Sequence, residues 1–415
     1  MNALGVLARL ARDKSGNALI MVAATAPLLI AASAIGLDTI QLTVAKRQLQ
    51  RSADSAALAG AYSIGQQKPP QSSVSRDLQL NNVIALKEPA TVENAPSSGP
   101  YAGNSRAVRV KLKATRAVPF ISFFTGSPMD IEVEATAALV LDGESCVISL
   151  ESTAVTGITF SGSTQVNLGC GVSTNSTSNT AIVADGSARV VASPVSAVGK
   201  VPPSSSYIGN TQILSNAFKQ VDPFASLPTP QVPTSCSPQY NVQPNQTRTI
   251  SPGCYQGMDI KGTLLMQPGV YIIDGGTLSF GSQANVTGEG VTFILTSSNA
   301  TSNPSSIATL SMHGGAVLNL KAPSTDTYKG VLLYQDRRSP MTNVQITGNS
   351  SSRFQGAFYL PSQQVTFNGN TGMQTRCIQF VARRMVFSGN SNIENQCQES
   401  EGSKAFDALA VRMVG

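Results

Sequence analysis

The chain begins with a long apolar segment that runs directly into an alanine-rich one. No charged side chain lies between Lys14 and Asp38, which leaves 23 uncharged positions at 15–37. As a helix this stretch would be ~34 Å long at ~1.5 Å per residue, enough to cross the ~30 Å hydrocarbon core of a bilayer. Pro27 lies inside it, and within a membrane a proline bends a helix without abolishing it. The pattern predicts a transmembrane helix, preceded by a short tail at 1–14.

Small side chains recur at every fourth position after the apolar segment, which predicts that the helix continues to about residue 63. They form one ridge along the predicted helix: Ala45, Leu49, Ala53, Ala57 and Ala61. Small residues allow close helix contacts, so we expect this ridge to pack against other helices. Gly65 and the Pro69-Pro70 pair predict the end of the helix.

The next segment, 64–141, has the mixed pattern of a small α+β unit. Residues 107–115 and 131–140 alternate between apolar and polar side chains, as strands do. Between them the apolar run 119–124 predicts a short helix on the core. A further helix is expected at 74–86, followed by a loop at 89–103.

A weak repeat runs through 142–398. The strings that begin at Ile158, Val344, Val365 and Met385 share one pattern: apolar, any residue, aromatic or Ile, polar, Gly, small polar. The last three begin 21 and 20 residues apart, and short strands at such a period predict a right-handed parallel β-helix. Val365 and Phe367 should then stack on Val344 and Ile346. An antiparallel β-sandwich is the alternative.

Two segments depart from this pattern. Residues 192–250 are rich in Pro, Ser and Thr, which predicts a long loop or a poorly ordered insertion. Residues 399–415 form a tail, in which 406–413 is expected to make a short closing helix. The predicted fold class is therefore α+β and membrane-anchored: a transmembrane helix with an amphipathic extension, a small α+β unit, and a mostly-β domain.

The cysteines fall into three local couples, which indicate an oxidising compartment. Locality alone selects the pairs Cys146–Cys170, Cys236–Cys254 and Cys377–Cys397. None forms a CxxC motif and His313 is the only histidine, so the cysteines do not indicate a zinc or redox site. Lys and Arg flank the apolar run equally, so the positive-inside rule gives no orientation. Disulfides would place the large C-terminal part outside the cytoplasm.

The charged residues do not suggest chemistry. The net charge is +6, but Lys and Arg are scattered in pairs such as Arg337-Arg338 and Arg383-Arg384, which suits a solvated surface better than a nucleic-acid interface. The candidate catalytic carboxylates of a β-helix enzyme are dispersed: Asp259, Asp274, Asp326 and Asp336. His313, in a Ser-Met-His-Gly-Gly string, is expected in a turn. We predict no enzyme activity, metal or cofactor.

The residues from 13 to 61 resemble a known family. The Asp-Lys-Ser-Gly-Asn string at 13–17, the apolar run, Asp38 and the Ala/Asp-rich string at 49–61 are similar to the N-terminal module of TadG-like proteins of the Tad (Flp) pilus assembly system. The strand–helix–strand at 108–140 is similar to the segment that comes after this module in the family. The resemblance implies a single-pass inner-membrane protein that faces the periplasm or cell surface. It also implies a structural role, with pilin-like subunits and the inner-membrane assembly platform as partners of the Ala45–Ala61 ridge.

Several questions stay open at this level. Relatives of the type IV pilin kind are cut after a Gly and carry Glu five residues beyond the cut; here Gly16 is followed by Met21 at that position, which argues against such processing. Ala32-Ser33-Ala34 resembles a signal-peptidase site, whereas the uninterrupted helix favours an uncut anchor. Asp54 is expected to pair with Arg51 or with a neighbouring subunit. The rival functions are an adhesin or glycan-binding β-helix, favoured if Tyr334 or Tyr359 is exposed, and a polysaccharide lyase or hydrolase.

Overall fold

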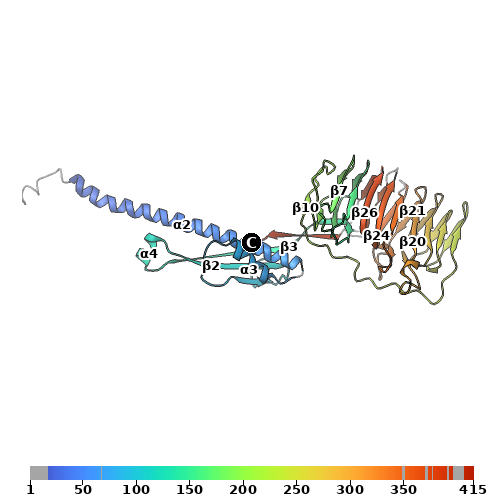
Figure 1. Cartoon of the computed structure of the whole chain (residues 1–415), viewed down its shortest axis with the longest axis horizontal. Coiled ribbons are helices and arrows are strands. Elements are labelled where there is room, and N and C mark those ends of the chain that lie inside the picture. The colour runs from blue at the N-terminus through green and yellow to red at the C-terminus, as the bar shows by residue number, and fades with distance from the viewer. Residues whose placement is uncertain are drawn as a thin grey trace, which may run out of the picture. The chain divides into compact units, whose positions relative to one another are not determined.

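The computed structural model describes residues 17–66, 68–347, 351–369, 373–375, 377–389, 392–395 and 406–415. The chain divides into two compact units (Figure 1). Unit 1 comprises Met1–Val140 and Val411–Gly415, and unit 2 comprises Leu141–Ala410. Each unit has a hydrophobic core of its own.

Helix α2, Asn17–Gly65, dominates unit 1 and is continuous through Pro27 (Figure 1). It ends at Gly65, as predicted from the residues after it. Large apolar side chains on its N-terminal half are exposed, whereas from Ala45 onward one side of the helix is buried. The helix therefore has a half that the protein does not cover and a half that packs into unit 1.

The rest of unit 1 is a small antiparallel sheet with two short helices. Strand β2, Ala107–Arg116, pairs with β1, Thr91–Asn94, and with β3, Met129–Ser149. The predicted strands at 107–115 and 131–140 are confirmed, while β1 occupies part of the predicted loop at 89–103. Helix α3, Pro70–Asn81, begins and ends earlier than predicted, because Pro70 suits the first helical turn and the backbone is extended at Asn82. Helix α4 spans Pro119–Thr125.

The C-terminal segment is a strand, and the predicted helix at 406–413 is wrong. Strand β28, Phe406–Met413, leads to a pair of backbone hydrogen bonds with β3. The amide of Thr136 donates to the carbonyl of Gly415 over 2.6 Å, and the amide of Val414 donates to the carbonyl of Thr136 over 2.9 Å. The backbone of β3 thus supplies hydrogen-bond partners for the end of the chain, which favours an extended conformation over a helix there.

Unit 2 is mostly β, and its strands pair in parallel with the strand three places further along the chain. The first series is β11 (Tyr240–Val242), β14 (Met258–Ile260), β17 (Thr277–Phe280), β20 (Thr309–Met312) and β23 (Asn343–Thr347). The second is β12 (Thr247–Ile250), β15 (Thr263–Met266), β18 (Asn285–Glu289) and β21 (Val317–Lys321). The third is β13 (Gly253–Tyr255), β16 (Gly269–Asp274), β19 (Val291–Thr296) and β22 (Val331–Gln335). Apolar side chains from all three series meet in one core.

Two long strands, β24 (Arg353–Gly369) and β26 (Cys377–Gly389), continue these series. The strands that come first in the sequence of unit 2 stack on β26: the end of β3 and β4 (Ile158–Phe160), then β6 (Gly171–Thr174) and β7 (Ile182–Ala184), then β9 (Val195–Ala197) and β10 (Ile213–Ser215). A second parallel sheet contains β5 (Gln165–Asn167), β8 (Arg189–Val191), β25 (Met373–Thr375) and β27 (Asn392–Asn395). The chain thus enters the stack in its middle.

The sequence repeat predicts the register of this stack correctly. Val344 pairs with Val365, which pairs with Met385, which pairs with Ile158. Two residues further along, on the same side of the strand, the ring of Phe387 lies 5.2 Å from that of Phe367 and 5.0 Å from that of Phe160, centroid to centroid. Gly162 and Gly389 close their strands with φ of 73° and 78°, left-handed values that glycine adopts without strain. The four strings are therefore neighbours, with the earliest one stacked on the latest.

The predicted loop at 192–250 is wrong as a description of that segment. It contains β9, β10, β11 and β12. Between β10 and β11 the chain crosses from one end of the stack to the other, and we call residues 216–239 the return segment. Proline favours an extended backbone without ladder hydrogen bonds, which suits a connection that runs across strands.

Candidate functional site

Helix α2 has the surface of a membrane span. Within the described residues it is the one helix long and apolar enough to cross a bilayer. Its exposed large apolar residues are Met21, Val22, Leu28, Leu29, Ile30, Ile35, Leu37, Ile40 and Val44. The hydroxyls of Thr25, Ser33, Thr39 and Thr43 each donate to the carbonyl four residues earlier, over 2.7–2.8 Å. Polar groups that are satisfied within the helix fit a surrounding without water.

The small-residue ridge packs inside unit 1. Ala45, Leu49, Ala53, Ala57 and Ala61 are all buried. They share one core with alternate side chains of β2 and β3, including Val110, Leu112 and Val133. The expectation that this ridge contacts pilin-like or assembly partners is therefore wrong: the chain's own sheet and α3 take the place predicted for other helices.

Asp38, the first charged residue after the apolar run, joins α2 to α4. One carboxylate oxygen accepts hydrogen bonds from the amides of Phe120, over 2.9 Å, and Ile121, over 2.6 Å. Asp38 itself is fully buried. The carboxylate caps the first turn of α4, where amides lack helical partners. Helix α4 thus lies on α2, not on the sheet core as predicted.

Asp54 has a partner on its own helix. It accepts a hydrogen bond of 2.8 Å from the side-chain amide of Gln50, one turn earlier. The predicted pairing with Arg51 is not formed: both Gln50 and Arg51 are spaced to reach Asp54, and Gln50 is the partner that binds it.

Two of the three predicted disulfides are present. Cys146 and Cys170 are joined with their Cα atoms 5.8 Å apart, and Cys236 and Cys254 with theirs 4.7 Å apart. Cys236 lies at the end of the return segment, so this bridge fixes that end to β13. Cys397 and the side chain of Cys377 lie outside the described residues.

The return segment covers an apolar outer face of the third strand series. Tyr334 of β22, Tyr359 of β24 and Val381 of β26 are fully buried beneath Phe224 and Leu227. Burial raises the pKa of Tyr334 to about 12. The tyrosines that the glycan-binding hypothesis requires at the surface are therefore covered by the chain itself.

Arg337 holds the return segment in place. Its guanidinium lies over the rings of Tyr334 and Tyr359, 5.5 and 5.3 Å from their centroids. It donates to the Tyr359 hydroxyl over 2.7 Å, to the carbonyl of Leu227 over 3.0 Å, and to the carbonyl of Phe224. The Tyr359 hydroxyl in turn donates to Asp222 over 2.7 Å. One cation thus connects β24 to two turns of the return segment.

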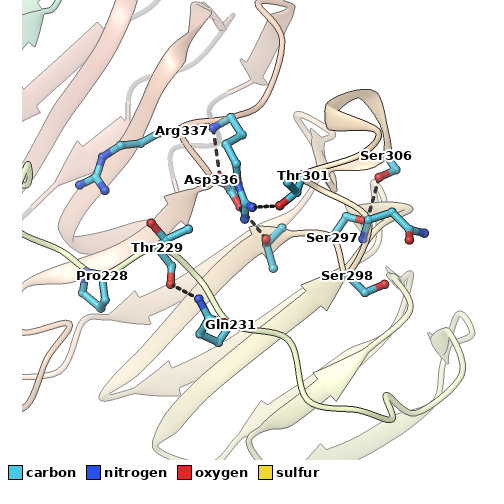
Figure 2. Close-up of polar contacts among 12 residues, drawn as sticks. Pro228, Thr229, Gln231, Ser297, Ser298, Thr301, Ser306, Asp336 and Arg337 are labelled. Carbon is cyan, nitrogen blue, oxygen red and sulfur yellow. Dashed lines mark hydrogen bonds and ion pairs between the residues drawn. The ribbon is translucent and has the colours of Figure 1, made fainter.

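The segments after β19 and β22 form a polar cluster next to the return segment (Figure 2). Asp336, which is buried, pairs with Arg338 over 2.6 Å and accepts a hydrogen bond from Thr296 over 2.8 Å. These contacts outweigh the effect of burial and hold the pKa of Asp336 below its ordinary value. Arg338 also donates to Thr301 over 2.8 Å.

The other candidate catalytic residues lie apart from this cluster or have structural partners. Asp274 accepts from the amide of Ser298 over 2.6 Å, and Asp259 pairs with Lys261 over 2.8 Å. Asp326 is exposed, in a left-handed turn conformation. His313 begins a turn that the amide of Ala316 closes, as predicted. Across the described ranges no three of His, Cys, Asp and Glu are grouped to hold a metal.

Glu151 lies just after β3 and connects it to β26. It is buried and accepts from Arg384 over 2.7 Å, from Arg383 over 3.2 Å, and from the amide and hydroxyl of Thr153. Burial alone would raise the pKa of Glu151, but these donors lower it to about 2. The arginine pair that looks like ordinary surface in the sequence is half-buried and clamps a buried carboxylate over 230 positions away.

These features define a class: a protein with one apolar helix fit to cross a membrane, carrying a β body of parallel strands. Residues 16–63 match the family model for Tad, the TadE/G-like Flp pilus-assembly proteins. This part of the chain is a TadE/G-like domain, as its resemblance implies. Comparison with curated proteins and with solved structures returned no match.

Proposed function

We propose that the protein is a non-enzymatic component of Tad (Flp) pilus biogenesis, anchored in the inner membrane by α2, with the sheet of unit 1 and the whole of unit 2 in the periplasm. The observation that carries this proposal is the coincidence of the TadE/G-like match at 16–63 with the exposed apolar half of α2. Other pilus components, namely pilin-like subunits and the assembly platform, are the proposed partners.

The orientation rests on the two disulfides. Cys146–Cys170 and Cys236–Cys254 both lie in unit 2, and such bonds persist in oxidising compartments. A bridge that closes a loop of about 20 residues contributes about 3 kcal/mol. Unit 2 therefore gains stability on the periplasmic side that a reducing cytoplasm would remove.

We infer that unit 2 is a right-handed parallel β-helix that presents a surface for pilus assembly or adhesion. Support comes from the parallel pairing of each strand with the strand three further on, and from the stacked repeat at Val344, Val365 and Met385. The polar turns around Asp336 are the part of unit 2 that would meet a partner, because the outer apolar face is already covered.

The test is deletion of the gene, with pili counted by microscopy and surface attachment measured. We expect both to fall, and to return when the full chain is supplied in trans. Unchanged pilus production and attachment would overturn the proposal. A reporter that is active only outside the cytoplasm, fused after Gly415, checks the orientation separately: it should be active, and an inactive fusion would refute the periplasmic placement.

A further inference from the structure

Helix α4 lies at the tip of a hairpin. Strands β2 and β3 pair without interruption as far as Arg116 and Met129, and α4 connects them. The side chains of this hairpin that belong to the core of unit 1 end with Ala114 and Ile131, before the last pairs, and Val118 at the start of α4 is buried outside that core. The tip therefore projects past the core of unit 1 and needs another contact to be held.

That contact is the last turn of the apolar run of α2. Across 21–44, the buried positions of α2 are Ala34 and Asp38, and α4 contacts the helix at Asp38. Because the two positions are one turn apart, they lie on the same side of α2. The hydrogen bonds from Phe120 and Ile121 to Asp38 fix α4 at this level, so α4 overlaps the end of the membrane span.

The side chains that α4 exposes there are apolar. Phe123 is 82% exposed and Phe120 is 38% exposed, and Met129 lies beside them at the end of β3. Leu37 and Ile40, on either side of Asp38, are also exposed. Arg116 is exposed at the end of β2. Aromatic side chains with nearby cations are typical of segments that lie in the interface between lipid and water.

We propose that α4 inserts Phe120 and Phe123 into the interfacial layer of the same bilayer that α2 crosses, and so makes a second lipid contact for unit 1. The proposal rests on the membrane-anchor part of the proposed function. Lipid is the occupant because Asp38 fixes α4 at the level of the first charge after the span, where Leu37 and Ile40 of α2 are exposed as well. A second contact of this kind sets the depth of α2 in the membrane.

The composition of the chain offers a direct test, because it contains no tryptophan. Single-tryptophan variants of the full chain report on one position each: Phe123→Trp at the tip, Leu29→Trp in the span, and Val83→Trp at an exposed site of unit 1 away from α4. Each variant is reconstituted into vesicles of phosphatidylethanolamine and phosphatidylglycerol. Quenching by lipids with brominated chains and by aqueous acrylamide is then measured.

We expect Phe123→Trp to be quenched by lipids brominated near the headgroup, with emission shifted to the blue and acrylamide quenching severalfold weaker than for Val83→Trp. Leu29→Trp should be quenched by lipids brominated deeper in the chains. If Phe123→Trp behaves like Val83→Trp while Leu29→Trp is quenched by lipid, the interfacial contact is refuted and the anchor stands. If Leu29→Trp is not quenched by lipid, the anchor itself fails.

A protein partner at the same site gives a different result. A blue shift of Phe123→Trp that grows with the protein-to-lipid ratio, without quenching by brominated lipid, would show that another copy of the chain covers α4 and would overturn the lipid contact. Phe120→Trp serves as a second reporter at the tip if Phe123→Trp does not fold. Near-identical circular dichroism of the variants and the unmodified chain is the control for folding.

Discussion

The two compact units differ in whether their apolar surfaces are exposed or covered. Unit 1 leaves the apolar side chains of the N-terminal half of α2 exposed, together with Phe120 and Phe123 at the tip that Asp38 holds against this helix. Unit 2 covers even the outer face of its third strand series, with residues from its own return segment. Its exposed large apolar side chains, such as Val155, Leu265 and Met341, occur singly. Single exposed apolar residues are ordinary, whereas a contiguous region marks an interaction surface. The comparison favours unit 1 as the part that makes the proposed membrane contact.

The largest expected effect tests the stacked core of unit 2. Phe367→Ala removes a ring that lies 4.4 Å from Phe380 and 5.2 Å from Phe387, centroid to centroid. We expect a loss of about 3–5 kcal/mol, because the aligned strands on both sides prevent collapse of the cavity. The loss of stability is measured by urea unfolding of the full chain, with limited proteolysis used to monitor the unfolding of unit 2. Thr366→Ala, on the exposed side of the same strand, is the control and should change stability little. Equal effects of the two variants would contradict the stacked core.

The second prediction tests the return segment, which covers the outer face of the third strand series in unit 2. Arg337→Met leaves the carbonyls of Phe224 and Leu227 and the Tyr359 hydroxyl without their cationic donor. We expect a loss of about 2–3 kcal/mol and faster proteolytic cleavage within 216–239. Arg248→Met, at an exposed position of β12, is the matched control. An unchanged cleavage rate would mean that Arg337 does not hold the return segment.

The third prediction concerns acid stability. The pKa of Glu151 is about 2 in the folded protein and 4.5 ordinarily, so its contribution is complete above about pH 4.5 and is lost as the pH falls toward 2. Glu151→Gln should cost about 1–3 kcal/mol at neutral pH and flatten the acid dependence of unit 2 over that range. Thermal unfolding of the variant and the unmodified chain between pH 2 and 7 measures this.

Glu93 offers the matched variant in unit 1. A hydrogen bond from Lys111 is the main cause that lowers its pKa to about 2. Glu93→Gln should therefore change the acid dependence of unit 1 and leave that of unit 2 intact. If Glu151→Gln retained the full acid dependence of unit 2, the clamp would be disproved.

The smallest effect is expected at the junction of α2 and α4. Asp38→Ala removes the acceptor for the amides of Phe120 and Ile121, at a cost of about 1 kcal/mol, typical of a lost helix cap. Hydrogen exchange of these two amides should become faster in the reconstituted protein. Asp38→Asn keeps one carbonyl oxygen and should have a smaller effect. Exchange that is equally slow in all three proteins would show that the carboxylate does not hold α4.

The sequence predicts local patterns well in this protein. The uncharged run, the alternation at 107–115 and the repeat at Val344, Val365 and Met385 depend on neighbours within about 20 residues, so their periods reveal helix, strand and stack. The two disulfides that join near neighbours are predictable from the same locality.

The features that pattern alone misses depend on partners far away in the sequence. The return segment looks unstructured because its ordering contacts come from Arg337 and Tyr334, more than 100 positions later. The ridge of α2 predicts close packing correctly, but nothing in its small side chains distinguishes the chain's own sheet from another subunit. The adjacent arginines at 337–338 and 383–384 are the one signal in the sequence that marks the contacts of the return segment and of Glu151. In the fold, Arg338, Arg383 and Arg384 bind buried carboxylates, and Arg337 binds backbone carbonyl oxygens.

The entry of the chain into the middle of the stack has a consequence for synthesis. Strands β3 and β4 emerge early, but their neighbour β26 lies more than 220 residues later. A polypeptide that crosses a membrane with its N-terminal part first therefore presents an unpaired strand edge until translocation is nearly finished. Such edges recruit other chains, so truncation before β26 should yield aggregates instead of a shortened, folded body.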